Sequence, residues 1–286
     1  MFRLAHLSDP HIGPLPSPRL GELIGKRATG YLNWRRGRAA HHRMDVLARL
    51  LDDIRAESVD HIAVTGDLIN IGLAAEYPAA RALLERIGPP ERVSFVPGNH
   101  DAYMRATVPG IVHHWRPWFL PDGVAPDEGG YAFPFVRRRG PVALIGVNSG
   151  VPSPPFLATG LLGARQIAAL EDELADLDRQ GLARIVLIHH PPFDIGFQKR
   201  LQDHEALARA LRRTGAELVL HGHTHKGTTR ALQGPKAEIP VIGVPSASAA
   251  ADGTAEPAAW NLITVEGEPG DWRIDVERRP VQGGRA

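Results

Sequence analysis

Side chains that can bind metal ions recur at the ends of apolar runs along this sequence. Each run, such as residues 2–8 or 93–96, has the length and composition of a β-strand. Open α/β sheets place their functional sites at the edge where their strands end. We therefore expect these side chains to gather at one centre. They are Asp9, His11, Asp67, Asn99, His189, His223 and His225.

The chemistry of this set favours a pair of metal ions. Carboxylate and amide oxygens mixed with imidazole nitrogens suit Mn, Fe or Zn better than Ca or Mg. Seven ligands are too many for one such ion and enough for two ions that share a ligand. The 286-residue chain has no cysteine, which excludes disulfides and thiolate zinc sites. The pattern predicts a binuclear metal hydrolase.

The rest of the chain indicates a single α/β domain over residues 1–286, with 43% hydrophobic and 23% charged residues, as in ordinary globular enzymes. Short apolar runs alternate with segments whose apolar residues recur at helical spacing. Strands are expected at 2–8, 61–65, 93–96, 142–147, 184–188 and 217–220, and helices at 44–57, 75–87 and 164–177. Three further runs, at 240–245, 260–265 and 272–276, have no long helix between them. We expect them to form an antiparallel addition that closes a second sheet.

Two segments fit neither pattern and are treated as insertions. Residues 13–43 separate the first strand from its helix, and residues 103–131 read as a loop-rich stretch that contains His113 and His114. Connections of this length inside a compact domain are usually functional or mobile. The second insertion is expected near the mouth of the site, and a contact of His113 or His114 with substrate stays an open alternative.

In their order along the chain, the ligand-bearing motifs resemble those of the calcineurin-like metallophosphoesterases, and within that superfamily the bacterial phosphodiesterase branch. The match runs from residue 2 to about residue 250. The resemblance implies a four-layer α/β/β/α sandwich, in which helices flank two sheets. The matching motifs are Asp9-x-His11, Gly66-Asp67, Gly98-Asn99-His100-Asp101, His189-His190-Pro191-Pro192 and Gly222-His223-x-His225.

The resemblance also implies a role for each ligand. One ion would be held by Asp9, His11 and His225. The other would be held by Asn99, His189 and His223, and Asp67 would bridge the two. Two cations roughly 3.5–4 Å apart can share a bridging hydroxide, which acts as the nucleophile, and can clamp phosphate oxygens during in-line attack.

Four further residues of these motifs are assigned roles outside the ligand set. His100 would donate a proton to the phosphoryl oxygen or the leaving group, and Asp101 would orient or charge it. His190 could face the substrate or support the site. His221 should face away from the metals because side chains alternate along a strand, so a core or surface role is expected.

Competing functions differ in what the sequence should contain. A non-catalytic scaffold with a decayed metal site would have lost ligands, whereas all seven are present together with His100. A nuclease would need a basic groove with interleaved aromatic residues. Only residues 13–43 have that composition, so no nucleic-acid partner is expected. The leading hypothesis is a phosphodiesterase; the alternatives are a cyclic-nucleotide phosphodiesterase and a phosphomonoesterase, since one metal pair can handle both ester classes.

Residues 19–43 bear on the substrate and on localisation. They contain seven basic residues against the single acid Glu22, interleaved with Tyr31, Trp34 and aliphatic residues, although the net charge of the whole chain is only +1. This composition is typical of segments at membrane interfaces. We expect a lid beside the metals that meets an anionic membrane and a phospholipid or lipid-linked pyrophosphate. The alternative is a helical cap whose arginines are merely solvated.

The sequence shows neither a signal peptide nor an apolar run long enough for a transmembrane helix. We therefore expect a cytoplasmic protein that is at most peripheral to the inner face of the membrane. No oligomeric state and no substrate-binding residue is assigned from the sequence.

Overall fold

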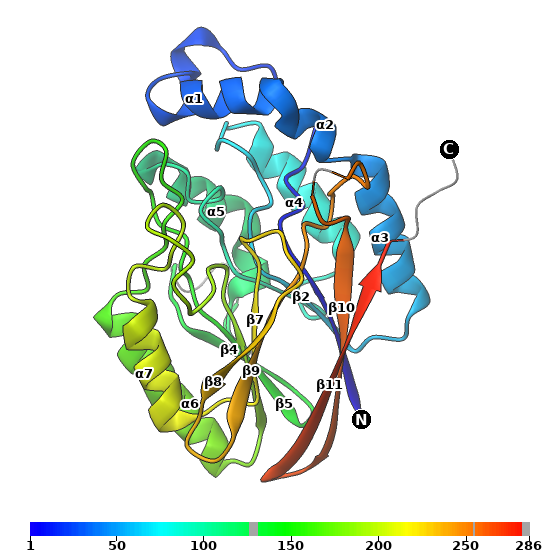
Figure 1. The fold of residues 1–286 in the computed structure, drawn as a ribbon, viewed down its shortest axis with the longest axis vertical. Coiled ribbons are helices and arrows are strands. Elements are labelled where there is room, and N and C mark those ends of the chain that lie inside the picture. The colour runs from blue at the N-terminus through cyan, green and yellow to red at the C-terminus, as the bar shows by residue number, and fades with distance from the viewer. Residues whose placement is uncertain (126–130, 254, 282–286) are drawn as a thin grey trace.

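The computed structural model describes residues 1–125, 131–253 and 255–281. Residues 126–130 of the predicted insertion at 103–131, and the last five residues of the predicted domain, lie outside this range. Two β-sheets pack face to face, and helices cover the outer side of each sheet (Figure 1). The predicted four-layer α/β/β/α sandwich is confirmed.

The first sheet has five strands in the order β11-β10-β1-β2-β3. Its parallel part consists of β1 (Phe2–Leu7), β2 (His61–Val64) and β3 (Val93–Phe95). Two long antiparallel strands, β10 (Ala259–Glu268) and β11 (Asp271–Pro280), extend it beyond β1. The helices α3 (Met44–Ala56) and α4 (Glu76–Ile87) bury their apolar stripes in the core cluster of this sheet.

The second sheet has six strands in the order β4-β5-β6-β7-β9-β8. The parallel strands β5 (Val142–Gly146), β6 (Ala183–Leu187), β7 (Leu218–His221) and β9 (Glu238–Gly243) form its centre. The antiparallel strands β4 (Phe135–Arg139) and β8 (Thr229–Gln233) form its edges. The helices α6 (Ala164–Arg179) and α7 (His204–Thr214) pack against this sheet in a separate core cluster.

The C-terminal strands are divided between the two sheets, so the prediction that they close the second sheet together was wrong. β9 joins the second sheet parallel to β7, whereas β10 and β11 extend the first sheet. Strand β8, which pairs with β9, was not predicted. Four of its five residues are exposed, so it lacks the apolar alternation by which strands are recognised in a sequence.

The two insertions differ in how they join the fold. The first forms α1 (Lys26–Asn33), a π-helical turn (Trp34–Arg38) and the short α2 (Ala39–His41), which lie across one end of the molecule (Figure 1). The second is not simply a loop, because it contains α5 (Val108–Trp115), whose Trp115 is fully buried in the first core cluster. Within the described residues, none of the helices combines the length and apolarity that crossing a bilayer requires.

Candidate metal centre

The ends of five parallel strands meet across the gap between the two sheets and bring all the predicted ligands to one region. β1, β2 and β3 arrive from the first sheet, and β6 and β7 arrive from the second. Backbone hydrogen bonds tie the loops together: Asp9 N–H donates to the Gly66 carbonyl at 2.9 Å, and Gly222 N–H donates to the His189 carbonyl at 3.1 Å. The ligand-bearing loops therefore hold one another in place.

Asp9, His11 and His225 form the first group of donor atoms. Nε2 of His225 lies 3.1 Å from Oδ1 of Asp9 and 3.3 Å from Nε2 of His11, which is 3.9 Å from Oδ1 of Asp9. Ligands about 2.1 Å from a shared ion lie roughly 3–4 Å from one another. Oδ1 of Asp9 is buried and accepts no hydrogen bond, although an unpaired buried carboxylate oxygen is costly. These atoms fit a metal ion.

Asp67, Asn99 and His189 form the second group. Nε2 of His189 lies 3.3 Å from Oδ2 of Asp67 and 3.3 Å from Oδ1 of Asn99. The imidazole of His223 packs against that of His189, with ring centroids 5.1 Å apart. Oδ2 of Asp67 is also 3.8 Å from Nε2 of His11, so this carboxylate stands between the two groups. Its position fits a ligand shared by two ions.

Three of these imidazoles have one ring nitrogen bonded to a backbone carbonyl. Nδ1 of His11 pairs with the Ile69 carbonyl at 3.1 Å, and Nδ1 of His189 pairs with the Thr65 carbonyl at 2.6 Å. Nε2 of His223 pairs with the Lys199 carbonyl at 2.9 Å. Since a carbonyl can only accept, each bonded nitrogen carries the proton and the other ring nitrogen is free to bind metal. Such outer partners fix the tautomer and orientation of metal-binding histidines.

The backbone around the ligands is strained in a way that indicates function. Five of the seven predicted ligands have positive φ angles between 39° and 66°, a region that non-glycine residues seldom occupy. Neighbouring glycines allow the loops to approach: a Cβ at Gly98 would overlap the Asp67 carboxylate, and a Cβ at Gly222 would overlap Ser8 and Asp9. Strain of this kind persists where the fold holds a functional arrangement. The five are Asp9, His11, Asp67, His223 and His225.

Burial keeps most imidazoles of the centre neutral, which is the state that binds metal. Burial, helped by the positive charge of Arg38, holds the pKa of His11 well below its usual value. Burial and the nearby His189 lower the pKa of His223 to about 3. His189 is the exception: burial alone would lower its pKa, but the charge and hydrogen bond of Asp67 raise it to about 9.

His100 lies beside the centre, whereas Asp101 does not take the position expected from the sequence. The expected contact between the two side chains is absent from the described hydrogen bonds, since Nδ1 of His100 pairs with the Asn70 carbonyl at 2.5 Å. The Asp101 carboxylate instead accepts backbone N–H groups from the loops after β2 and β3, including Asp67 and Gly98, each at 2.8 Å. Asp101 thus organises the ligand loops rather than His100.

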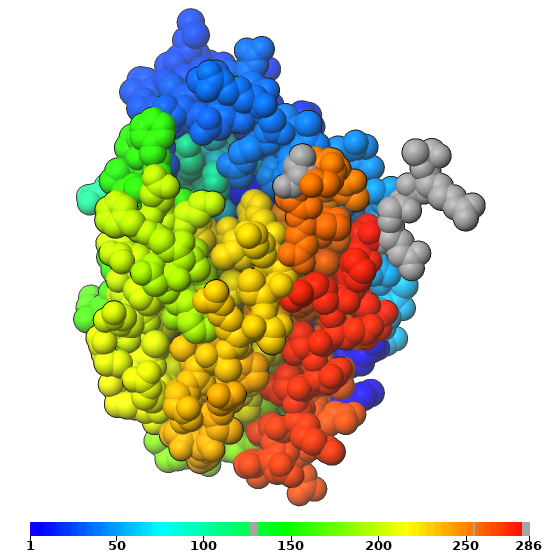
Figure 2. Space-filling view, viewed as in Figure 1, coloured from blue at the N-terminus to red at the C-terminus, as the bar shows by residue number. Residues whose placement is uncertain are grey.

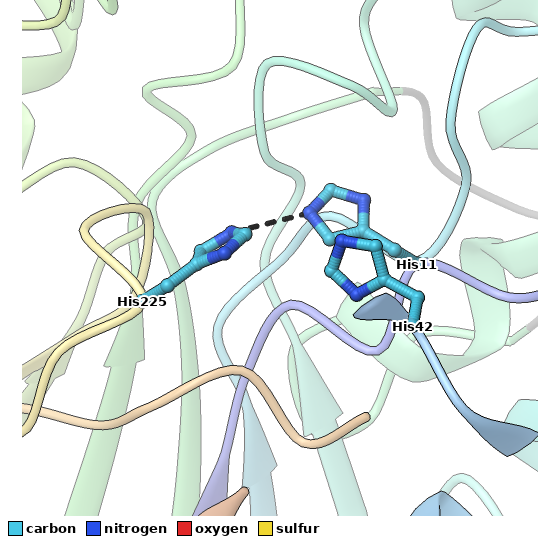
Figure 3. Close-up of side chains that lie close together, drawn as sticks. All are labelled: His11, His42 and His225. Atoms are coloured by element: carbon cyan, nitrogen blue, oxygen red, sulfur yellow. Dashed lines mark hydrogen bonds between the residues drawn. The ribbon is translucent and has the colours of Figure 1, made fainter. Parts of the chain in front are cut away.

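Two residues of the first insertion reach the centre without having been singled out in the sequence. The imidazole of His42 lies 4.6 Å from that of His11 and 5.8 Å from that of His225, measured between ring centroids (Figure 3). The guanidinium of Arg38 lies 3.3 Å from Nε2 of His11 and 3.3 Å from Nε2 of His100. Both belong to a run of basic residues in which no motif distinguishes them, so only the predicted proximity of this segment to His11 pointed toward them.

The other histidines lie in different surroundings. His190 is buried, and its ring nitrogens pair with the Ser149 hydroxyl at 2.8 Å and the Ala158 carbonyl at 3.2 Å. His221 is buried and pairs with the Gly222 carbonyl at 2.9 Å. In the second insertion, the His114 ring stacks on Tyr77 with ring centroids 6.2 Å apart, and His113 is its neighbour on α5. None of these contacts is with the seven ligands.

Comparisons with known proteins agree with this geometry. A family model described as calcineurin-like phosphoesterase matches residues 2–227. A probable cyclic nucleotide phosphodiesterase of Synechococcus sp. strain WH7803 is 28% identical over 259 residues, which cover 86% of this chain and 82% of that protein. A glycerophosphodiester phosphodiesterase of Enterobacter lignolyticus is 28% identical over 243 residues, which cover 83% of this chain and 76% of that protein.

Solved structures with the same fold include enzymes of distant organisms. A dimetal phosphatase from Danio rerio superposes with a TM-score of 0.62 at 14% identity and covers 98% of this chain and 96% of its own. A purple acid phosphatase from yellow lupin seeds has a TM-score of 0.64 at 13% identity and covers 99% of this chain and 52% of its own. At these identities the likeness shows the fold. The family match shows more, and it confirms the predicted enzyme class: this chain belongs to the calcineurin-like phosphoesterase family of hydrolases.

Proposed function

We propose that this chain is a phosphodiesterase that uses two metal ions. Asp9, His11 and His225 would hold one ion, and Asn99, His189 and His223 would hold the other. The observation that carries the proposal is the position of Asp67, whose carboxylate stands within 3.8 Å of His11 in one group and 3.3 Å of His189 in the other. The donor set of neutral imidazoles, carboxylates and an amide oxygen suits Mn, Fe or Zn.

A bound metal pair activates water and neutralises the charge of a phosphoryl group. The chain itself supplies a proton-transfer group in His100. Because Nδ1 of His100 pairs with the Asn70 carbonyl, its Nε2 is the atom turned to the centre, 3.3 Å from Arg38. Nε2 would exchange a proton with the leaving oxygen of the substrate, a role typical of general acid catalysis.

A diester is the preferred substrate class because the relatives described above are phosphodiesterases. A cyclic nucleotide is the alternative favoured by the Synechococcus relative, which is named a probable cyclic nucleotide phosphodiesterase. A phosphomonoester is a further alternative, because the same metal pair could act on both ester classes.

Within the diesters, a phospholipid or lipid-linked pyrophosphate is supported by exposed apolar side chains around the centre. Leu20 and Ile24 in the first insertion are 92% and 69% exposed, and Phe156 and Phe197 in neighbouring loops are 77% and 70% exposed. Lys26 Nζ bonds the Ser153 hydroxyl at 2.7 Å, and Ala158 N–H bonds the Gln198 carbonyl at 2.8 Å, so these segments adjoin (Figure 2). Apolar side chains among basic residues suit an anionic membrane surface.

The test of the metal mechanism is hydrolysis of bis(p-nitrophenyl) phosphate at mildly alkaline pH. Chelation followed by dialysis should abolish turnover, and Mn²⁺ should restore it. The stoichiometry of bound metal should approach two ions per chain. Full activity after chelation, or one ion at saturation, would contradict the two-metal proposal.

The test of the lipid proposal is co-sedimentation with phosphatidylglycerol vesicles at low and moderate salt, with phosphatidylcholine vesicles as the uncharged control. The double substitution Ile24→Ser and Phe156→Ser should reduce sedimentation with the anionic vesicles. It should also reduce turnover of long-chain diesters more than turnover of bis(p-nitrophenyl) phosphate. Equal sedimentation with both lipids and no preference for acylated substrates would refute this specific substrate class while leaving the phosphodiesterase proposal intact.

A further inference from the structure

Arg38 is held at the metal centre by a built arrangement rather than by chance. Trp34, four residues earlier, is buried, and its ring is parallel to that of His42. On α1, Gly30 packs so closely on Tyr103 that a Cβ there would overlap the phenol, and the Tyr103 hydroxyl donates to the Lys26 carbonyl at 3.1 Å. The insertion is thus anchored before and after Arg38.

The helical path also changes direction immediately before this residue. The π-helical turn from Trp34 to Arg38 contains Gly37, whose backbone angles are not helical. Such turns often occur at functional sites because they re-aim a side chain. Arg35 and Arg36 in the same turn are exposed, whereas Arg38 is partly buried and bonds to residues of the centre.

The hydrogen-bond partners of Arg38 differ from those of the buried arginines elsewhere in the fold. The Arg137 guanidinium donates to four backbone carbonyls at 2.6–2.7 Å, and Arg184 pairs with Glu217 at 2.9 Å. Arg38 pairs only with imidazole nitrogens of His11 and His100. Within the described residues, no carboxylate lies within ion-pair distance of it. Its charge is therefore not neutralised locally.

Metal binding would remove even this partner. Once Nε2 of His11 holds a cation, it has no lone pair left to accept a hydrogen bond from Arg38. The guanidinium would then stand beside added positive charge with unused donors. An anion is the ligand that satisfies both conditions, because phosphate oxygens accept the planar N–H fork of arginine and carry the opposite charge.

We propose that Arg38 forms an anion-binding position on the substrate side of the centre and binds non-bridging oxygens of the phosphoryl group. This inference rests on the proposed function, since it takes a phosphoester as the substrate. It assigns a substrate contact to the first insertion, which lies outside the seven ligand positions. The insertion would therefore contribute directly to the affinity for the substrate phosphate.

The experiment compares Arg38→Gln and Arg38→Lys with the wild type and with Arg49→Gln, which removes a surface arginine on α3. Three quantities are measured on Mn²⁺-loaded protein: bound metal, affinity for inorganic phosphate by calorimetry, and kcat and KM for bis(p-nitrophenyl) phosphate. Arg38→Gln should retain both ions and bind phosphate at least tenfold more weakly, with a raised KM. Arg38→Lys should be intermediate, because it keeps the charge and loses the fork. Arg49→Gln should match the wild type.

The outcomes separate this inference from the proposed function. Unchanged phosphate affinity and KM in a fully metal-loaded Arg38→Gln protein would overturn the role of Arg38 while the hydrolase proposal stands. Weaker phosphate binding in that variant, with a wild type that does not hydrolyse diesters, would support Arg38 and reject the diesterase. Loss of metal in both Arg38 variants would mean that the arginine supports the ligands instead, and would also overturn the inference.

Discussion

The carboxylate of Asp101 accepts a hydrogen bond from the backbone amide of Asp67 at 2.8 Å, although the two residues lie 34 positions apart. The same carboxylate accepts the amides of Leu68 at 2.9 Å and Gly98 at 2.8 Å. It thereby joins the loops that follow β2 and β3. Asp67 and Asn99 keep their relative positions through a residue that need not touch a metal ion.

Replacing Asp101 with Asn should therefore damage the fold and the metal site together. The amide group would oppose backbone N–H donors where a carboxylate oxygen now accepts them. Losing charge-assisted hydrogen bonds of this kind costs about 3 kcal/mol of unfolding free energy. Urea unfolding and the metal content after dialysis would measure the two effects. An Asp52→Asn control, at an exposed ion pair on α3, should change neither; a wild-type unfolding midpoint for Asp101→Asn would contradict the clamp.

His100 and Asp67 should respond differently to substitution. His100→Ala should keep its metal and lose turnover by about 100-fold or more, the range expected for a proton-transfer group. Asp67→Asn should lose metal as well as turnover, since its carboxylate stands between both donor groups. Metal analysis and kcat on the same samples distinguish the two. A His100→Ala enzyme with full metal and unchanged rate would remove His100 from the mechanism.

The sequence predicted the fold and the ligand candidates well because both depend on local patterns. Buried strands such as β5 and β6 are continuous apolar runs, and polar residues follow directly where the strands end. The sheet assignment of β10 was not predictable in this way, since pairing with β1 joins residues such as Leu4 and Ile263 that are far apart in the chain. Periodicity shows that a strand exists but does not identify its partner.

The same distinction explains what was missed at the centre. Arg38 and His42 are brought there by the helical path of the insertion, which their neighbours in sequence do not reveal. The role of Asp101 depends on which backbone amides it meets, and these belong to a different loop. Ligand chemistry can be recognised from residue types and spacing, whereas outer contacts require the three-dimensional arrangement.

His42 gives a prediction about metal affinity. Its Nδ1 pairs with the Ser248 hydroxyl at 2.9 Å, while its ring lies against His11 in the first donor group. His42→Gln should weaken binding of that ion by about tenfold, as expected for a residue that supports or extends a ligand set. Titration with a graded chelator would measure the loss. His113→Gln, at an exposed histidine on α5, is the control; identical titration curves for both variants would exclude a metal-supporting role.

His61 gives a prediction about stability and pH that does not involve the metals. Its side chain is fully buried in β2, with Nε2 paired to the Ser94 hydroxyl at 2.9 Å and Nδ1 without a partner. Burial, helped by the charges of Arg139, Arg137 and Arg92, lowers the pKa of His61 to about 2. Protonation would place a charge and an unpaired N–H in the core.

The sign of the pH effect follows from this depressed pKa. Below about pH 6.5 the unfolded chain takes up a proton at His61 that the folded chain refuses, so stability falls as the pH drops toward 2. Between pH 6.5 and 5 this single group should cost about 2 kcal/mol of unfolding free energy. Urea unfolding of chelated protein at pH 7.5 and 5 would measure the fall, and His61→Gln should reduce it by about that amount. If wild type and variant lose equal stability over this interval, the buried neutral state of His61 is not what makes folding sensitive to acid.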